Sequence, residues 1–447
     1  MGGLSALPAS QLMAERPGRK PNVLYVFADQ LRYSALGCIG NRQVRTPNID
    51  KLAAQGLVFT NAISGFPLCS PYRAMLMTGR YGQSTGLVTN DVLLPPTSDS
   101  FANVLKRAGY QTGLIGKWHL DEHRRPFVAK DHRQGFDYWV TENCNHNYFD
   151  TPTCFGDETE PRRLKGYQPD AQTDLAIDYI GEHKAEPFFL CLSWSTPHNP
   201  YVAPKQWMSM YSPDGIKQRP NVEGDFRADI AHYYAMVSNL DYCIGRLMRA
   251  LSEAEIEEDT IFVFTSDHGD VLGVHGQGSA RKQRPWEESI HIPFILRYPR
   301  QAPSDRKTDV LLNTVDVMPT VLGLAGVPIP SCVEGADLSG PALGRGGKEP
   351  ESVFLQDILP CGEAKSVFGP WRGVRTKRYT YARFRDKGWV LYDNSKDPYQ
   401  LNNLIGKPEA SKLQAEMENK LQAWLKRTKD DFASAEEWEQ RLGRKVR

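Results

Sequence analysis

The segment CSPYRAMLMTGR, which starts at Cys69, combines a nucleophile, a cation and the signals of a short helix. Ser70 is a residue type that caps helix N-termini, Pro71 suits the first helical position, and Gly79 suits a C-terminal stop. This pattern places Cys69 at the start of a helix, where free backbone N–H groups and the helix dipole favour an anion. Arg73, one turn further on, adds a positive charge. The segment therefore predicts a nucleophile in an anion-binding site.

Four further polar clusters follow apolar, β-rich runs of the chain. They are, in chain order, Asp29-Gln30, 116–119 (GKWH), 195–200 (STPHNP) and 266–270 (SDHGD). In an open α/β sheet, ligands bind at the carboxyl ends of the strands. We therefore expect the four clusters to share one crevice.

The first and last of these clusters carry ligands suited to a hard cation. Asp29, Gln30 and Asp267 offer two carboxylates and an amide oxygen, and His268 adds an imidazole. This donor set suits Ca²⁺, with Mg²⁺ or Mn²⁺ as alternatives. Each residue taken alone also fits an ordinary turn or surface position.

The other two clusters carry groups that could neutralise an anion or transfer a proton. Lys117 and His119 are two residues apart, so an extended segment would place them on the same side. His198 stands in the sequence Pro-His-Asn-Pro, which predicts a rigid turn and a fixed donor. Lys282 and its neighbour Arg281 are both candidates for a cation that holds the anion.

The elements that must position these residues alternate between strand and helix. Apolar, strand-like runs separated by helical patterns extend from about residue 20 to residue 330, and they include 23–27, 112–115, 188–194, 261–264 and 293–296. This alternation predicts the α/β class, with a large, mostly parallel central sheet flanked by helices.

A stretch rich in Pro and Gly, 327–350, separates this region from a different pattern. Beyond it, three short runs between residues 371 and 392 alternate like antiparallel strands, and 410–427 has the pattern of a charged amphipathic helix. We therefore predict a catalytic α/β domain at 20–345 and a smaller C-terminal α+β subdomain at 346–447, with an antiparallel sheet and a helix.

The bulk composition is that of an ordinary globular protein. The 447 residues carry a formal net charge of +1, with 40% hydrophobic and 24% charged residues. No broad charge excess indicates nucleic acid or a membrane surface as a partner, and no apolar run is long enough to cross a bilayer. The eight cysteines are scattered without a CxxC pair, which argues against a zinc site or a dense disulfide framework, although Cys144 and Cys154 could pair.

Residues 1–20 lack the apolar core of a signal peptide. We therefore expect a cytoplasmic protein, with an exported protein whose signal has been removed or replaced as the alternative. The sequence leaves the oligomeric state open.

With these residues assembled, the chain resembles the type I sulfatases of the alkaline phosphatase superfamily, from residue 21 to residue 393. The most specific match is CSPYRAMLMTGR, which resembles the family's C-x-P-x-R signature. In that family a maturation enzyme oxidises the cysteine to formylglycine. Supporting matches are 46–50, 116–119, 266–269 and 282–293. The resemblance implies an alkaline-phosphatase-like fold.

The resemblance also implies a role for each candidate residue. One divalent cation, usually calcium, would be held by Asp29, Gln30, Asp267, His268 and the modified Cys69. The sulfate and the formylglycine would be surrounded by Arg73, Lys117, His119, His198 and Lys282.

The chemistry implied is hydrolysis of a sulfate ester through a formylglycine hydrate. One hydroxyl of the hydrate would attack sulfur, and the other would lose its proton as sulfate leaves. His198 or Lys282 would protonate the leaving alcohol, and His119 would take the hemiacetal proton. The expected substrate is a sulfated small molecule or saccharide, and the segment 143–149 (NCNHNYF) with Trp194 could line a sugar-sized pocket.

Three residues depart from the family's commoner pattern. Tyr72 stands where many members have serine, Gln30 replaces a second aspartate, and His268 replaces an asparagine. The last two also resemble the choline-sulfatase and phosphonate monoester hydrolase branch. A phosphonate monoester hydrolase or phosphodiesterase is therefore one alternative, and a non-catalytic binding relative with unmodified Cys69 is another. A thiol-nucleophile hydrolase is less favoured, because the neighbours form a cation site and not a Cys–His pair.

Overall fold

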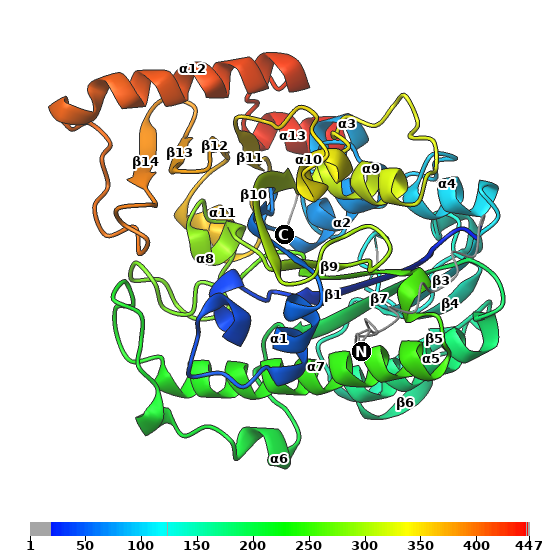
Figure 1. The fold of residues 1–447 in the computed structure, drawn as a ribbon. Helices are drawn as coiled ribbons and strands as arrows, with labels where there is room; N and C mark the ends of the chain where they lie inside the picture. Colours follow the sequence, from blue (N-terminus) through cyan, green and yellow to red (C-terminus); the bar gives the residue numbers. More distant parts are fainter. Residues whose placement is uncertain (1–18, 123, 444, 446–447) are drawn as a thin grey trace, which may run out of the picture.

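The computed structural model describes residues 19–122, 124–443 and 445, which form two β-sheets and the helices around them (Figure 1). Most of the segment on which the expectation about a signal peptide rests, residues 1–18, lies outside the described residues. Within the described part, no helix combines the length and the apolar character needed to span a bilayer.

The larger sheet has ten strands in the order β10-β2-β9-β8-β1-β7-β3-β4-β5-β6. Their bounds are β1 Asn22–Asp29, β2 Leu57–Ile63, β3 Gln111–Lys117, β4 Tyr138–Asn143, β5 Phe149–Phe155, β6 Arg162–Tyr167, β7 Phe188–Pro197, β8 Thr260–Ser266, β9 Phe294–Arg297 and β10 Arg306–Asn313. The central strands β8, β1, β7, β3 and β4 are parallel, whereas β9, β5 and β6 pair antiparallel with their neighbours. The predicted large, mostly parallel sheet is confirmed.

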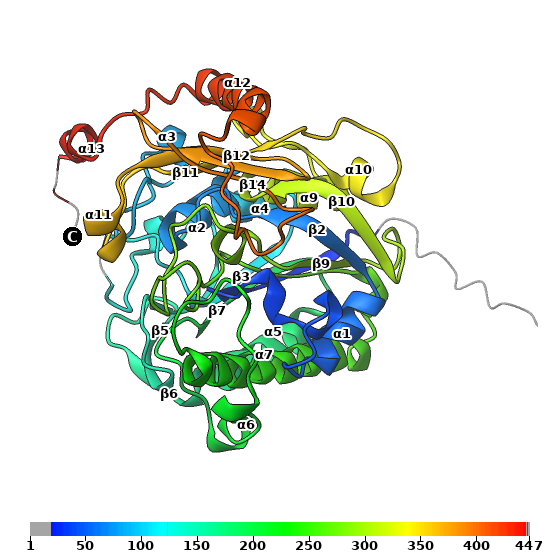
Figure 2. The same ribbon diagram turned by 90° about the vertical axis from the view of Figure 1, so that its left-hand side faces the viewer.

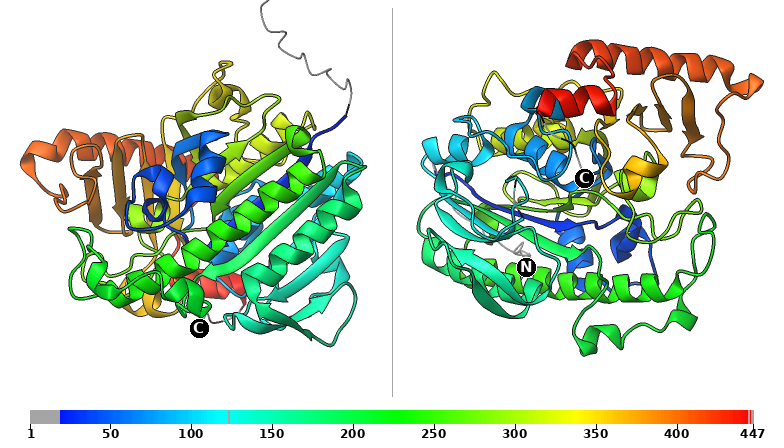
Figure 3. Two further views of the ribbon diagram at one scale, coloured as in Figure 1. Left: turned by 60° about the horizontal axis from the view of Figure 1, so that its bottom comes forward. Right: turned by 180° about the vertical axis from the view of Figure 1, so that it is seen from behind.

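The sheet lies between two layers of helices (Figure 1). One layer holds α1 (Pro47–Ala54), α5 (Gln168–His183) and α7 (Arg227–Glu253), and α5 and α7 run side by side across the sheet (Figure 3, left). The other holds α2 (Cys69–Thr78), α4 (Phe101–Arg107) and α9 (Thr314–Leu324). Strand β1 is buried throughout, so its alternate side chains enter the two hydrophobic cores on opposite faces of the sheet.

The smaller sheet lies in the C-terminal region, and its strands are all antiparallel (Figure 2). It consists of β11 (Val353–Asp357), β12 (Trp371–Arg375), β13 (Tyr379–Arg383) and β14 (Gly388–Asp393). Helix α12 (Ser411–Thr428) packs on β12 and β13 through a buried stripe at Met417, Leu421 and Leu425. The predicted antiparallel sheet with its helix is confirmed, while the boundary at residue 345 stays a prediction.

Shorter helices complete the fold. They are α3 (Gly82–Thr85), α6 (Lys205–Met208), α8 (Glu287–Ile290), α10 (Ser339–Leu343), α11 (Glu363–Val367) and α13 (Ala435–Leu442). All eight cysteines lie within the described residues and are free, so the possible disulfide between Cys144 and Cys154 does not form.

Helix α2 begins earlier than the sequence pattern indicates. Its N-cap is Leu68, in extended conformation, and Cys69 is already helical. The hydroxyl of Ser70 has no hydrogen-bond partner, and the backbone N–H of Ser70 donates to the side chain of Asn90 at 3.0 Å. The prediction that Ser70 caps the helix is therefore wrong, because Asn90, twenty residues later, supplies an acceptor for this free N–H group. Gly79 ends the helix as predicted, with a left-handed φ of 61°.

Candidate active site

The predicted cation ligands gather at one edge of the large sheet. Asp29 ends β1, Cys69 begins α2, and Asp267 and His268 directly follow β8. One ligand atom from each of these four residues lies within 4.8 Å of the others, and each residue is at most 1% exposed. The carboxyl ends of neighbouring parallel strands thus meet in one place, as the sequence pattern indicates.

In both Asp29 and Asp267, one carboxylate oxygen contacts a positively charged side chain and the other faces the cluster. Oδ2 of Asp29 accepts a hydrogen bond from Nζ of Lys117, and Oδ2 of Asp267 lies 3.2 Å from Nη2 of Arg73. The Oδ1 atoms of both carboxylates lie 3.6 Å from Nε2 of His268. Two carboxylate oxygens and one imidazole nitrogen therefore border the same small volume.

The imidazole of His268 is held in one orientation. Its Nδ1 lies 3.0 Å from the carbonyl oxygen of Gly269 and donates to it, which leaves Nε2 for the cluster. Burial opposes protonation, but the charges of Asp267 and Cys69 raise the pKa of His268. The cluster therefore stabilises positive charge at Nε2, whether a proton or a metal cation.

Gln30 also directs an oxygen to this volume. It has a left-handed φ of 73°, and its Nε2 donates to Oδ2 of Asp270 at 2.6 Å. Its Oε1 accepts from Nζ of Lys282 at 2.9 Å, and the same Nζ lies 3.5 Å from Sγ of Cys69. Because Asp270 is itself held by the hydroxyl of Tyr201, the amide is fixed with its oxygen toward the cluster.

This donor set fits a hard divalent cation. Carboxylate and amide oxygens are the ligands that Ca²⁺ takes, and one imidazole is compatible with Mn²⁺. Burial and the neighbouring Asp29 raise the pKa of Asp267, because two carboxylates share one buried space. A divalent cation would remove this repulsion.

Residue 69 lies where negative charge is stabilised. Sγ of Cys69 is 3.3 Å from Nε2 of His268 and 3.5 Å from Nζ of Lys282. Burial and Asp29 oppose ionisation, but Lys117, Lys282 and His268 together hold the pKa of Cys69 well below its ordinary value. The prediction of an anion-stabilising position at the start of α2 agrees with these contacts.

Arg73 links helix α2 to β3, to β7 and to the residue that follows β8. Its Nη1 donates to the carbonyl oxygen of Lys117 at 2.8 Å and to Oγ of Ser193 at 2.7 Å, while Nη2 reaches Asp267. The guanidinium also stacks over the ring of Phe27, 4.8 Å from its centroid. These contacts make Arg73 a structural support of the cluster, and its direct contact with a bound anion stays a prediction.

Lys282, and not Arg281, faces residue 69. Nζ of Lys282 lies 2.7 Å from Nε2 of His198, in addition to its contact with Cys69. Arg281 instead lies 3.6 Å from Glu363. Of the two candidate cations that the sequence offered, Lys282 is therefore the one that lies beside residue 69.

His198 accepts a hydrogen bond from Lys282 and does not carry the proton of the pair. Its Nδ1 donates to the carbonyl oxygen of Asn199 at 2.7 Å, and its ring stacks on His146 with centroids 4.1 Å apart. Burial and the charge of Lys282 hold the pKa of His198 well below its ordinary value. Lys282 thus donates the hydrogen bond of the pair, and His198 accepts it.

His119 does not follow the alternation that the sequence suggested. The φ of 56° at His119 shows that the backbone is not extended there, so the alternation of an extended strand does not place its side chain on the same side as that of Lys117. Nε2 of His119 lies 3.0 Å from Oδ1 of Asp91. Burial opposes protonation, but the charge of Cys144 and the hydrogen bond with Asp91 raise the pKa of His119 to about 10.

Sequence reasoning missed several buried polar residues around the cluster. Asp91 and Ser193 stand in no motif, whereas Asp270 belongs to the SDHGD cluster and could have been found there. Glu142, at the end of β4, accepts from Oγ of Ser195 at 2.8 Å, and burial raises its pKa to about 7. Trp194, expected beside a sugar, is instead fully buried in the core, so that expectation is wrong.

Comparisons with known proteins agree with this arrangement. The sulfatase family model matches residues 21–327, and a model of the C-terminal region of N-sulphoglucosamine sulphohydrolase matches residues 276–427. The chain is 38% identical to the ulvan-active sulfatase of Formosa agariphila over 427 residues, which cover 93% of this chain and 83% of that protein.

Solved structures show the same fold. The structure of BT4656 in complex with its substrate, D-glucosamine-2-N,6-O-disulfate, matches with a TM-score of 0.82 and 26% identity, over 92% of this chain and 99% of that chain. The phosphonate monoester hydrolase of Agrobacterium radiobacter shares the fold with a TM-score of 0.74 and 23% identity, over 93% and 96% of the two chains. The chain belongs to the sulfatase family, whose members hydrolyse sulfate esters.

Proposed function

We propose that this enzyme hydrolyses a sulfate ester on a carbohydrate, with formylglycine made from Cys69 and with Ca²⁺ as its cation. The observation that carries the proposal is the buried cluster of Asp29, Asp267 and His268 around residue 69, with Lys282 beside it. Support for a carbohydrate substrate comes from the ulvan-active relative and from the glucosamine disulfate bound by BT4656.

The cation would be held by Asp29, Gln30, Asp267, His268 and an oxygen of the modified residue 69. When bound, it would supply positive charge that draws the anionic ester to residue 69 and lowers the pKa of the nucleophile there. Formylglycine in its hydrated form supplies two hydroxyls, so that one forms the bond to sulfur and the other allows sulfate to be released. A thiol has no second group of this kind.

The remaining residues orient the ester and move protons. Lys282 would neutralise the sulfate and donate its Nζ proton to the leaving alcohol, because its neighbour His198 is held neutral by burial and by the Lys282 charge. Lys117 would hold Asp29 ionised, and Arg73 would fix the strand ends that carry the ligands. His119, oriented by Asp91, would exchange the proton of the second hydroxyl.

Maturation would precede folding. Cys69, Pro71 and Arg73, the three residues of the signature, are buried at the start of α2. A formylglycine-generating enzyme would therefore have to meet this segment in the unfolded chain.

The test begins with co-expression with a maturation enzyme and mass spectrometry of the peptide that contains residue 69. The matured protein is then assayed with 4-nitrophenyl sulfate, a phenylphosphonate ester and a panel of sulfated saccharides. We expect sulfate release that Cys69→Ala abolishes and that Cys191→Ala, which removes a buried thiol in the core, leaves intact. A wide preference for the phosphonate would favour the alternative hydrolase, and a cysteine that stays unmodified would favour the non-catalytic alternative.

A further inference from the structure

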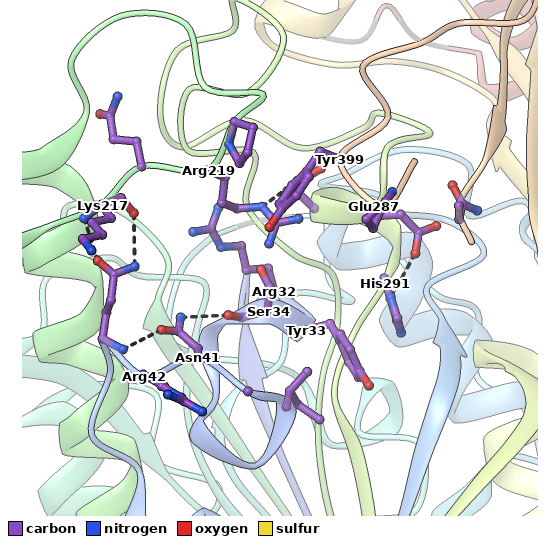
Figure 4. Close-up of a pocket in the computed structure, with 18 of the residues that line it drawn as sticks. Arg32, Tyr33, Ser34, Asn41, Arg42, Lys217, Arg219, Glu287, His291 and Tyr399 are labelled. Atoms are coloured by element: carbon purple, nitrogen blue, oxygen red, sulfur yellow. Dashed lines mark hydrogen bonds and ion pairs between the residues drawn. The ribbon is translucent and has the colours of Figure 1, made fainter. Parts of the chain in front are cut away.

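A cavity near the catalytic cluster is lined by residues that the proposed reaction does not use. It has a volume of about 840 Å³ and lies between the loops that follow β1 and the C-terminal region (Figure 4). Arg32, Arg219 and Tyr399 lie together in it, with Arg42 and Lys217 on one side and Glu287 and His291 on the other (Figure 4).

The cavity has an excess of positive charge. Six cationic side chains line it against two carboxylates, those of Glu287 and Glu288; the six are Arg32, Arg42, Lys217, Arg219, Arg375 and Lys377. Three of them have carboxylate partners, since Arg375 pairs with Glu287, Arg219 with Glu288, and Lys377 with Asp309 and Glu349.

The other three cations, Arg32, Arg42 and Lys217, form no side-chain ion pair or hydrogen bond with any described residue. Arg42 and Lys217 are exposed, whereas Arg32 is only 1% exposed, and its Nε and Nη1 are buried without a partner. Against the effect of burial, the charges of Glu288 and Asp270 help to raise the pKa of Arg32, but its Nε and Nη1 still lack a hydrogen-bond acceptor among the described residues, which an anionic group from outside the chain could supply.

The cavity also presents an unused acceptor. Oε1 of Glu288 accepts from Arg219 at 3.1 Å and from Asn221 at 3.0 Å, but Oε2 is buried without a partner. A ligand that offers both an anionic group and a hydroxyl donor would satisfy Arg32 and Glu288 together. The half-buried side chains of Tyr399 and Arg219 form part of the cavity wall, with the guanidinium of Arg219 stacked 4.8 Å from the centroid of the Tyr399 ring.

We infer that this cavity is a non-catalytic binding site for an anionic segment of a saccharide chain. The expectation that the ligand is anionic rests on the cavity alone, whereas the choice of a saccharide rests on the proposed function. The cavity is linked to the catalytic cluster through the backbone, because Arg32 stands two residues after Gln30 and the backbone N–H of Gly269 donates to the carbonyl oxygen of Ser289, next to Glu288. A polymer held here would be kept close to the enzyme between cleavage events.

The experiment measures binding of immobilised dextran sulfate, with unmodified dextran as the neutral probe, to the full-length protein at about 0.15 M salt. We expect wild-type protein to bind dextran sulfate and not dextran. Arg42→Glu combined with Lys217→Glu should weaken this binding about tenfold or more, the equivalent of about 1.4 kcal/mol. The matched control is Arg163→Glu with Lys165→Glu on β6, which makes the same charge change on another exposed surface and should stay within about twofold of wild type.

Arg32→Gln provides a second variant, which should lose binding because the buried donor is removed. If Arg32→Gln does not fold, the comparison between the two double variants still tests the inference. Absence of dextran sulfate binding by wild type, unchanged binding by the cavity variant, or equal losses in both double variants would each overturn the inference. Binding does not require turnover, so a matured protein that binds dextran sulfate but does not hydrolyse 4-nitrophenyl sulfate would overturn only the proposed function.

Discussion

Replacement of Arg73 by methionine is expected to destabilise the protein by removing the group that links helix α2 to three strands of the sheet. The substitution keeps most of the apolar stem but deletes two hydrogen bonds from Nη1, to Lys117 and Ser193, and the ion pair of Nη2 with Asp267. Both partners of that ion pair are at most 2% exposed, so water cannot replace the lost contacts.

The size of the effect follows from the burial. Breaking a buried ion pair by removing one partner costs about 3–5 kcal/mol, and we take about 4 kcal/mol here. The unfolding entropy of about 2.1 cal/mol/K per residue gives about 0.9 kcal/mol/K for 447 residues. The melting temperature should therefore fall by about 4 °C. Because Arg73 lowers the pKa of Asp267 against the effect of burial, its loss should be more harmful at high pH than at low pH, where the carboxyl accepts a proton more readily.

The assay is thermal unfolding followed by circular dichroism, with chelator present so that no cation compensates for the missing charge. Arg73→Lys should give an intermediate loss, because it keeps the charge but not the planar fork. Arg107→Met serves as the control, since the Arg107–Asp99 pair is exposed and should change the melting temperature by less than about 1 °C. The reasoning fails if Arg73→Met melts within about 1 °C of wild type, or if the control loses as much.

Three further outcomes are expected. Saturating CaCl₂, at about 100 times its dissociation constant, should raise the free energy of unfolding of wild type by about 2.7 kcal/mol, and Asp267→Asn should remove this gain in thermal melts; an equal gain in both proteins would contradict the cation site. Asp91→Asn should lower the pKa of His119 from about 10, as followed by NMR titration of the ring, because it removes a charge-assisted hydrogen bond, and an unchanged pKa would show that Asp91 does not set it. Burial raises the pKa of Asp357 to about 8, so the folded state keeps a proton that the unfolded state loses, and stability should fall between about pH 4 and pH 8. Asp357→Asn should reduce this loss in melts at pH 5 and pH 8.5, and an identical pH dependence would argue against the assignment.

Much of the fold could be read from local patterns. The continuous apolar run at 23–27 predicts a strand buried on both faces, and β1 is buried over its whole length. Strand β2 was not anticipated although its sequence, LVFTNAI, is also apolar, and neither was β10, which pairs with it. These two strands are almost 250 residues apart, so their pairing leaves no signal among neighbouring residues and is decided by the tertiary fold.

Part of the site could be predicted in the same way. Asp29, Asp267 and His268 were recognisable because Asp29 ends a strand and the other two directly follow one, where parallel sheets place their ligands. Asp91 was not, because it is one acidic residue in a loop, and only its contact at 3.0 Å with His119 identifies it.

By itself, the sequence determined the residue types of the site, the strands that carry them and the start of α2 to within two residues, since the N-cap is Leu68 and not Ser70. These follow from periodicity and from local backbone preferences, which act over a few neighbouring residues. Only the tertiary structure decided that Lys282 and not Arg281 faces Cys69, that His198 accepts a hydrogen bond from Lys282, and that Nε and Nη1 of Arg32 are buried without an acceptor in the described part of the chain. Such outcomes depend on contacts between distant segments, where a few ångströms of packing select one charged side chain over its neighbour.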